Sequence, residues 1–306
     1  MEQSNNTYII GNTISSSLEE VKTKHIIPVF TKDNSALISQ AAFVEVMCEE
    51  ISNMGYSQVS SPDIRLSHPV KGRIPEACHK SKEELLPSEE TLFYERMIFL
   101  YRISDITASI GGQTLSLVIG GVKAYNQDNF NKDYRGIQHF KIFIGFQVKV
   151  CSNLCIWSDG SVVDLKVNDL DTLRFHIAKM ITAFRAEHIV KQIQSFQDYS
   201  ITENQFAHIV GRCRLLIHSN QKLDTHLSKL DITDSQVNHV VKQYFTDQNF
   251  GGNSSGIDLW SLYNLFTDGS KNAYIDKFVG RNAHASTLVQ DVVDHLENRK
   301  ESYFLN

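Results

Sequence analysis

The chain has 306 residues, of which 42% are hydrophobic and 21% charged, and this composition excludes a largely disordered protein. Its net charge of −5 excludes a uniformly basic nucleic-acid-binding surface but leaves room for a local basic face. The odd number of dispersed cysteines, the polar N-terminus and the lack of any run of 18 apolar residues predict a cytoplasmic protein with reduced thiols and no membrane contact.

The first third of the chain predicts a flexible start, an edge strand and one helix. Residues 1–20 are rich in Ser and Asn, and we expect them to be flexible. The segment HIIPVF at 25–30 predicts a short strand, whose proline is typical of a sheet edge. A helix is predicted from Asn34 or Ser35 to Gly55, because glycine is favoured just after a helix C-terminus.

The middle of the chain changes to the period of β-structure. Residues 62–68 predict a short strand, and a polar loop of about twenty residues follows it. Aromatic and β-branched residues then alternate with polar ones, as in an antiparallel sheet with one buried face. The predicted strands lie within residues 91–103, 113–126, 139–150 and 154–167. Gly111-Gly112 predicts a hairpin turn, whereas Gly120-Gly121 predicts a bulge or a close backbone approach inside a strand.

The rest of the chain predicts helices. A long helix is expected from Asp169 or Asp171 to about Phe196, and Thr202 and Gln205 form a capping box for the next one. Further helices are predicted at 234–246, 258–267, 271–279 and 285–298. The predicted fold is therefore α+β, with an N-terminal helix, a central antiparallel β-meander, a long helix after the sheet and a helical C-terminal third.

This order of elements also predicts the domain organisation. After the flexible residues 1–20, we expect an α+β core over 21–200 and a helical subdomain over 201–306 that packs on the core. No linker-like segment separates the two.

The most suggestive segment for function is the predicted polar loop. Residues 61–82 contain five basic and two acidic residues, and Pro69 and Pro75 restrict the backbone. Arg65, Lys71 and Arg73 therefore predict contacts with nucleic-acid phosphates, with His68 as an additional donor. The alternative is a solvated loop whose cations pair with the five glutamates of residues 83–98.

Two further segments are mildly basic. Residues 123–149 interleave basic and aromatic side chains, among them Lys123 and Tyr125, which is a pattern that suits single-stranded nucleic acid. The predicted long helix carries four basic residues as well. A shared binding groove requires that all three segments converge in space.

Signatures of catalysis and of metal binding are absent from the sequence. It contains no G-x-S-x-G, no H-E-x-x-H and no phosphate-binding loop, so we predict no catalytic residue, no metal and no cofactor. Cys151 and Cys155 lack a second ligand pair and are predicted as core thiols rather than zinc ligands. Asp63, Glu83 and Glu95 are the one carboxylate set from which a metal-dependent nuclease could be built.

Several stretches resemble an uncharacterised family of phage- and plasmid-like proteins from bacterial mobile elements. They include SHPVKGRIPEA, LSLVIGGVKAYN, FIGFQVKVCSNLCIWSDG and WSLYNLFTDGSKNAYID. In the last of these stretches, Trp260, Tyr263 and Asn264 share a helical face, and we expect them to anchor the C-terminal helices to the sheet. The resemblance implies an accessory role and no chemistry. The order of meander and long helix is similar to that in phage single-strand annealing proteins.

The sequence thus predicts a non-enzymatic accessory protein that binds nucleic acid, with single-stranded DNA as the favoured ligand. The first alternative is a protein-interaction or counter-defence module with an acidic surface, because acidic surfaces attract basic partners. The second alternative is the metal-dependent nuclease. The oligomeric state is left open.

Overall fold

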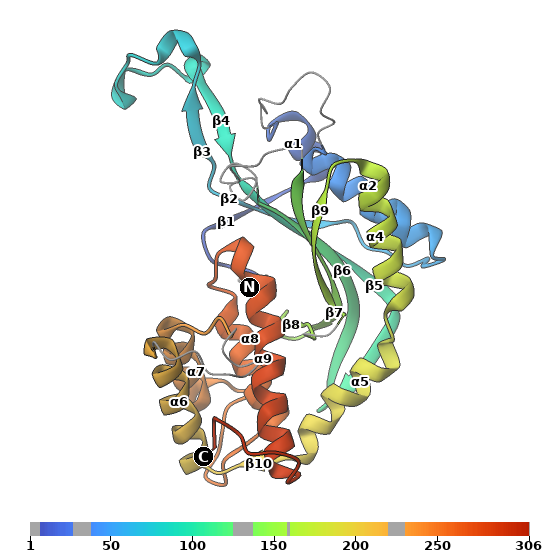
Figure 1. Cartoon of the computed structure of the whole chain (residues 1–306), viewed down its shortest axis with the longest axis vertical. Coiled ribbons are helices and arrows are strands. Elements are labelled where there is room, and N and C mark those ends of the chain that lie inside the picture. The colour runs from blue at the N-terminus through green and yellow to red at the C-terminus, as the bar shows by residue number, and fades with distance from the viewer. Residues whose placement is uncertain (1–6, 27–37, 125–136, 158–159, 220–229, 306) are drawn as a thin grey trace, which may run out of the picture.

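The computed structural model describes residues 7–26, 38–124, 137–157, 160–219 and 230–305. The fold is α+β, as predicted: a curled antiparallel sheet carries helices on both faces, and the last third of the chain is helical (Figure 1).

The main sheet has neighbours in the order β1–β2–β5–β6–β7, and both β8 and β9 pair with β7. The strands are β1 (Thr13–Ser16), β2 (Asp63–Ser67), β5 (Arg96–Ile110), β6 (Gln113–Ala124), β7 (Gln138–Val148), β8 (Leu154–Cys155) and β9 (Val162–Val167). Every pairing is antiparallel, so the predicted meander is confirmed. Gly111 and Gly112 form the β5–β6 turn with φ of +57° and +73°, which explains the glycine pair at this turn.

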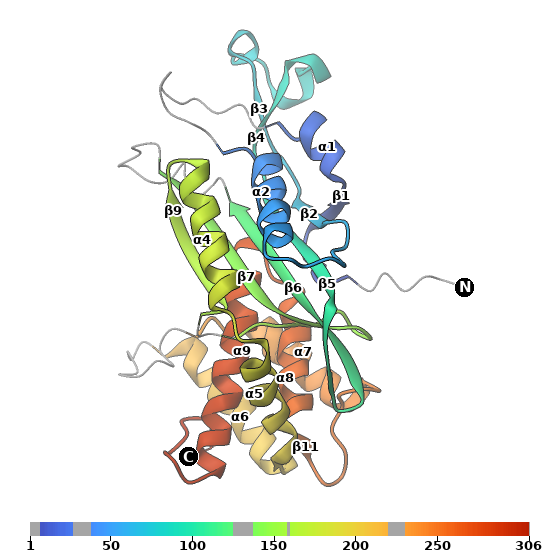
Figure 2. The ribbon, with the colours of Figure 1, turned by 90° about the vertical axis from the view of Figure 1, so that its right-hand side faces the viewer.

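Helices cover the two faces of the sheet separately. They are α1 (Leu18–Thr23), α2 (Gln40–Asn53), α4 (Leu170–Ala183), α5 (Ala186–Ser195), α6 (Glu203–His218), α7 (Asp234–Thr246), α8 (Leu259–Ser270) and α9 (Ile275–Leu296). α2, α4 and α5 lie along one face, whereas α9 packs on the opposite face (Figures 1 and 2). Within the part of the chain described here, no helix has both the length and the apolar character needed to cross a bilayer.

The central strands are buried on both faces, which corrects the prediction of a half-buried sheet. From Leu117 to Ala124, each successive residue of β6 is buried, and Phe143 to Val148 of β7 behave in the same way. Two hydrophobic cores result. The larger lies under α2, α4 and α5 and extends into the C-terminal helices, and the smaller lies between the sheet and the first half of α9.

Two predicted helix boundaries are wrong. The helix expected over 169–196 breaks between α4 and α5, where Phe184 has extended backbone and packs against Phe146 in the core. The guanidinium of Arg185 donates to carbonyl oxygens that the break leaves unpaired, including that of Thr182. Conversely, the helices expected at 271–279 and 285–298 are one helix, α9, which tolerates Gly280 because its position faces open space.

The N-terminal part contains more regular structure than its composition indicates. Residues 13–16 form the edge strand β1, and Ser17 begins α1 with a capping box that includes Glu20. The strand expected at 25–30 lies mostly outside the described residues, and 25–26 have no regular structure. The helix end at Gly55 is confirmed by its φ of +84°.

The predicted polar loop is instead a projecting arm. Residues 70–94, called the arm below, contain β3 (Val70–Arg73) paired with β4 (Glu90–Tyr94) as a separate two-stranded ribbon. The arm extends away from the sheet in both views (Figures 1 and 2). A further short pair, β10 (Ser200–Ile201) and β11 (Ile257–Asp258), joins the starts of α6 and α8.

The glycine pair in β6 allows helix α2 to reach the sheet. A Cβ at Gly121 would lie 2.3 Å from Cζ of Phe43, and a Cβ at Gly120 would lie 2.2 Å from the carbonyl oxygen of Phe99. Phe43 also makes edge contacts with the rings of Phe99 and Phe140, at centroid distances of 5.0 and 4.8 Å. The predicted close backbone approach is thus found at Gly120, whereas at Gly121 the group that approaches is a phenylalanine ring.

We expect the substitution Gly121→Ala to destabilise the protein by about 2 kcal/mol, because the added methyl group forces Phe43 out of its site. Gly211→Ala in α6 is the matched control: no atom lies within 4 Å of its Cβ position, so a stabilisation of about 0.5–1 kcal/mol is expected. Urea unfolding measures both values. Equal effects at the two glycines would contradict the packing role of Gly121.

Candidate functional site

The arm is an antiparallel ribbon closed by a compact tip. Three 3₁₀ turns form the tip, at Pro75–Ala77, Lys82–Glu84 and Pro87–Glu89. Proline at the first position of two of these turns costs no hydrogen bond, because the first amide of a turn has no internal partner. The tip buries Ala77 but leaves Leu86 56% exposed.

The predicted phosphate contacts on the arm already have partners within the arm. The ammonium of Lys71 pairs with Glu90 across the ribbon, and that of Lys80 pairs with Glu89. The guanidinium of Arg73 donates to the carbonyl oxygen of Lys80. The hydrogen bond from Lys80 also lowers the pKa of Glu89. The sequence left open an alternative in which the cations of this segment pair with the glutamates that follow. The structure shows this alternative for Lys71 and Lys80.

The remaining predicted residues do not gather beside the arm. His68 is exposed at its base. The guanidinium of Arg65 donates to Thr13 Oγ1 at 3.1 Å and thereby ties the edge strand β1 to β2. Lys123 is fully buried, with Nζ 4.0 Å from the centroid of Phe140, so its assignment as a surface phosphate contact is withdrawn.

The three basic segments are not brought into one groove by the described residues. Tyr125 lies outside the residues that the structure describes. The arm and α4 are well separated in both views (Figures 1 and 2). On α4, Arg174 already contacts Glu49 and Glu50 of α2, at 2.7 and 2.9 Å.

A buried acid lies where the arm leaves the sheet. Glu95 is the one residue between β4 and β5, and its side chain has no exposed surface. Its Oε2 lies 3.0 Å from Nδ1 of His25, while Oε1 has no hydrogen-bond partner among the described residues. Burial raises the pKa of Glu95, and His25 opposes this rise.

Other polar side chains lie on the same face of the sheet as Glu95. Lys123 of β6 pairs with Met97 of β5 on one side and with Phe140 of β7 on the other. Because successive side chains of a strand alternate between the two faces, Glu95, Lys123 and Gln138 lie on one face. Gln40, at the start of α2, is buried there too, and neither of its amide atoms has a partner in the described part of the chain. Each such unpaired buried group costs about 1–3 kcal/mol, so stability alone does not account for this cluster.

The carboxylates considered for a nuclease are dispersed. Asp63 begins β2, Glu83 lies in the arm tip, and Glu95 is paired with His25. Across the described residues, no group of three or more His, Cys, Asp or Glu side chains could hold a metal ion.

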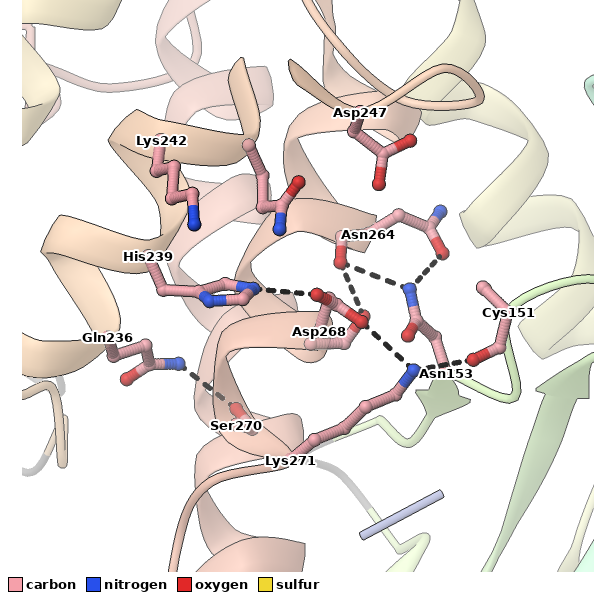
Figure 3. Close-up of polar contacts among 12 residues, drawn as sticks. Cys151, Asn153, Gln236, His239, Lys242, Asp247, Asn264, Asp268, Ser270 and Lys271 are labelled. Atoms are coloured by element: carbon pink, nitrogen blue, oxygen red, sulfur yellow. Dashed lines mark hydrogen bonds and ion pairs between the residues drawn. The ribbon is translucent and has the colours of Figure 1, made fainter. Parts of the chain in front are cut away.

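A second polar cluster joins the C-terminal helices to the sheet (Figure 3). Asp268 of α8 accepts from two sides: its Oδ2 lies 2.6 Å from Nε2 of His239 on α7, and its Oδ1 lies 2.9 Å from Nζ of Lys271. Lys271 is buried and also donates to the carbonyl oxygen of Cys151 in the β7–β8 turn. Although burial opposes it, the contacts with His239 and Lys271 lower the pKa of Asp268.

The same turn is held by a pair of asparagines, one of which, Asn264, the sequence analysis placed on the anchoring face of its helix. Nδ2 of Asn153 donates to the carbonyl oxygen and to Oδ1 of Asn264, both at 3.2 Å, and both residues are buried. Ser152 between the two anchored residues has a φ of +60°, a conformation that is costly for a residue other than glycine. Trp260 is buried and lies against the β5–β6 turn, next to Gly111, which confirms its predicted anchoring role.

The thiols beside this cluster are poorly suited to nucleophilic chemistry. Burial raises the pKa of Cys151 to about 11, so its thiolate is scarce near neutral pH. Cys155 is fully buried and its pKa is raised for the same reason. All five cysteines are free. His239 oriented by Asp268 is the arrangement of a general base, but its contacts fasten α7, α8 and the β7–β8 turn together.

His239, Asp268 and Lys271 were not identified from the sequence. The signal available was local: Asp268 and Lys271 are three residues apart at the end of a helix, where a lysine is favoured by the helix dipole. His239 is 29 residues away, and only the packing of α7 on α8 brings it to Asp268.

We expect Asp268→Asn to lower the free energy of unfolding by about 3 kcal/mol at neutral pH, because it leaves the buried ammonium of Lys271 without a counter-charge. The folded pKa of Asp268 is lowered, so its contribution is present above the pKa of an unfolded aspartate, about 4, and is lost as the pH falls through the folded value.

Chemical denaturation from pH 7 to pH 3 tests both statements, since the difference between the wild type and Asp268→Asn must shrink as the pH falls. Glu45→Gln is the control, because its pair with Lys22 is 42% exposed on both sides and solvent screens it, so a much smaller difference is expected. A difference that persists unchanged at pH 3 would contradict the charge-based explanation.

Comparison with known proteins identifies a family and no function. No curated protein matches the chain, and no solved structure matches it either. A family model with the description "Domain of unknown function, B. Theta Gene description (DUF3871)" matches residues 1–305, and the chain therefore belongs to this family.

Proposed function

We propose that the chain is a non-enzymatic binding protein whose contact element is the arm and whose partner is another protein. The observation that carries this proposal is the arm itself, a two-stranded ribbon that projects from the molecule and has no second layer against it among the described residues (Figures 1 and 2). An isolated two-stranded ribbon is marginally stable in water, so a partner that covers it would stabilise it.

The surface of the arm favours a protein over a nucleic acid. Aliphatic side chains are exposed along it, with Val70 40% and Leu86 56% exposed. Its lysines at 71 and 80 are paired with glutamates, so little net positive charge remains. Exposed aliphatic groups rimmed by balanced charges are typical of protein interfaces, whereas phosphate binding needs unpaired cations.

Single-stranded nucleic acid is the second candidate, and one observation favours it. The side chain of Lys71 is 59% exposed within its pair, and His68 and Arg73 are exposed nearby. Exposed ion pairs contribute at most about 1 kcal/mol, so a phosphate could replace Glu90 as the partner of Lys71. Arg65 is held by Thr13 and would contribute less.

The biological setting is proposed on weaker grounds. The quoted sequence stretches resemble proteins of phages, plasmids and other mobile elements, and this resemblance supports an accessory role on such an element. The free cysteines are compatible with a cytoplasmic location.

We expect Leu86→Ser to weaken partner binding about tenfold or more, because a leucine buried at an interface contributes about 1.5–3 kcal/mol. A photoreactive group on the exposed Cys78 of the tip would cross-link the partner in lysate of the source cells. Leu215→Ser on α6 is the matched control, since Leu215 is 60% exposed but distant from the arm. Equal cross-linking by both variants would exclude the arm as the contact element.

A titration of labelled single-stranded DNA separates the two candidates. If nucleic acid is the ligand, binding weakens steeply between about 50 and 200 mM salt, and Lys71→Ala with Arg73→Ala weakens it for all sequences alike. If the partner is a protein, we expect no binding at the lower salt concentration.

A further inference from the structure

The root of the arm is held from both faces of the sheet by two successive residues. Glu95 points to the face covered by α2, where it meets His25. Arg96 points to the opposite face, where its Nε lies 3.3 Å from Oδ1 of Asp276 and its guanidinium lies 5.7 Å from the ring centroid of Tyr274, at the start of α9. Since these residues connect β4 directly to β5, the two contacts fix the direction in which the arm leaves the sheet.

Only one of the two contacts depends on protons near neutral pH. An arginine stays charged at all physiological pH values, so the contact between Arg96 and α9 is permanent. The other contact joins a buried carboxyl to an imidazole, and burial raises the pKa of this carboxyl. One root contact can therefore be weakened while the other stays in place.

We infer that the His25–Glu95 pair is a pH-sensitive switch for the arm, which fixes the direction in which the arm leaves the sheet in mildly acidic solution and frees the root of the arm as the pH rises. This inference rests on the proposed function only in so far as the arm is the contact element. It assigns to the buried cluster a role in regulating when the arm is presented to its partner.

The direction of the switch follows from the burial of Glu95. The side chain of Glu95 has no exposed surface, so its ionised form loses solvation, and the contact with His25 offsets only part of this loss. The pKa of Glu95 is raised by burial. The state in which the root of the arm is held is therefore most stable at low pH, and it loses stability as Glu95 ionises. Each unit by which the pKa of Glu95 differs between the held and the released root changes the equilibrium between these two states about tenfold.

His25 and Gln40 of α2 oppose the rise in the pKa of Glu95 but do not cancel it. Gln40 and Gln138 of β7 are neutral at every pH. Lys123 of β6 lies on the same face, and its ammonium stacks on Phe140. Oε1 of Glu95 remains without a hydrogen bond among the described residues, and Oε2 contacts His25.

The test uses the full chain labelled at Cys78, the exposed cysteine of the arm tip, with a fluorophore whose anisotropy reports the mobility of the arm. Cys155 and Cys213 are buried, and mass mapping of the labelled peptide confirms the position of the label. We expect the anisotropy of the wild type to fall as the pH rises from about 5.5 to 8.5. Glu95→Gln should remove this dependence, because its side chain is neutral throughout.

Glu50→Gln is the matched control, because Glu50 is also a buried carboxylate but pairs with Arg174, away from the arm. This variant should keep the pH dependence of the wild type. His25→Gln is a second, independent variant, and its arm should become mobile at a lower pH than that of the wild type. This variant serves if Glu95→Gln does not fold.

The outcomes separate the switch from the docking role of the arm. An anisotropy that is flat with pH in the wild type, or a dependence that survives in Glu95→Gln, overturns the switch, whatever the cross-linking shows. A pH-dependent anisotropy together with unchanged cross-linking by Leu86→Ser overturns the docking proposal and leaves the switch standing.

Discussion

The double-sided burial of β5, β6 and β7 is the constraint on which the rest of this fold depends. Strands that bury successive residues need a helical layer on each face, and the chain supplies α2, α4 and α5 for one and α9 for the other. The close approach of α2 is possible because Gly121 has no side chain at the point in β6 where the ring of Phe43 packs. A single hydrophobic face, as in a simple two-layer domain, would not have required the C-terminal helices to return to the sheet.

The polar contacts have a different purpose from the hydrophobic ones, because they fix positions at the ends of the sheet. Asp268, Lys271 and the asparagine pair hold the β7–β8 turn against α8, where Ser152 is kept in an unfavourable backbone conformation. At the opposite end, Glu95 and Arg96 hold the root of the arm from two faces. The protein thus has polar contacts at both ends of the sheet, and the arm projects from one of these points.

The arm changes the functional interpretation of the basic segment. As a list of residues, 61–82 is a cationic loop, but in the arm Lys71 of β3 pairs with Glu90 of β4, and Lys80 pairs with Glu89 in the tip. Pairing across the ribbon leaves the aliphatic side chains as the distinctive exposed feature. This is the physical reason why a protein partner is favoured over a polyanion, and why the buried Lys123 takes no part in either role.

The sequence by itself determined the fold class, the antiparallel order of the main strands, the Gly111-Gly112 turn and the capping box at Thr202, because these depend on local periodicity and on residues with special backbone preferences. The same signals predicted the anchoring role of Trp260.

Only the tertiary structure decided that the loop after β2 is an arm with paired cations, and that the helix after the sheet breaks at Phe184. It also decided that His239 contacts Asp268 and that His25 contacts Glu95. These features depend on contacts between residues far apart in the chain, and their energies are set by burial and by the orientation of neighbouring elements, neither of which a local pattern contains.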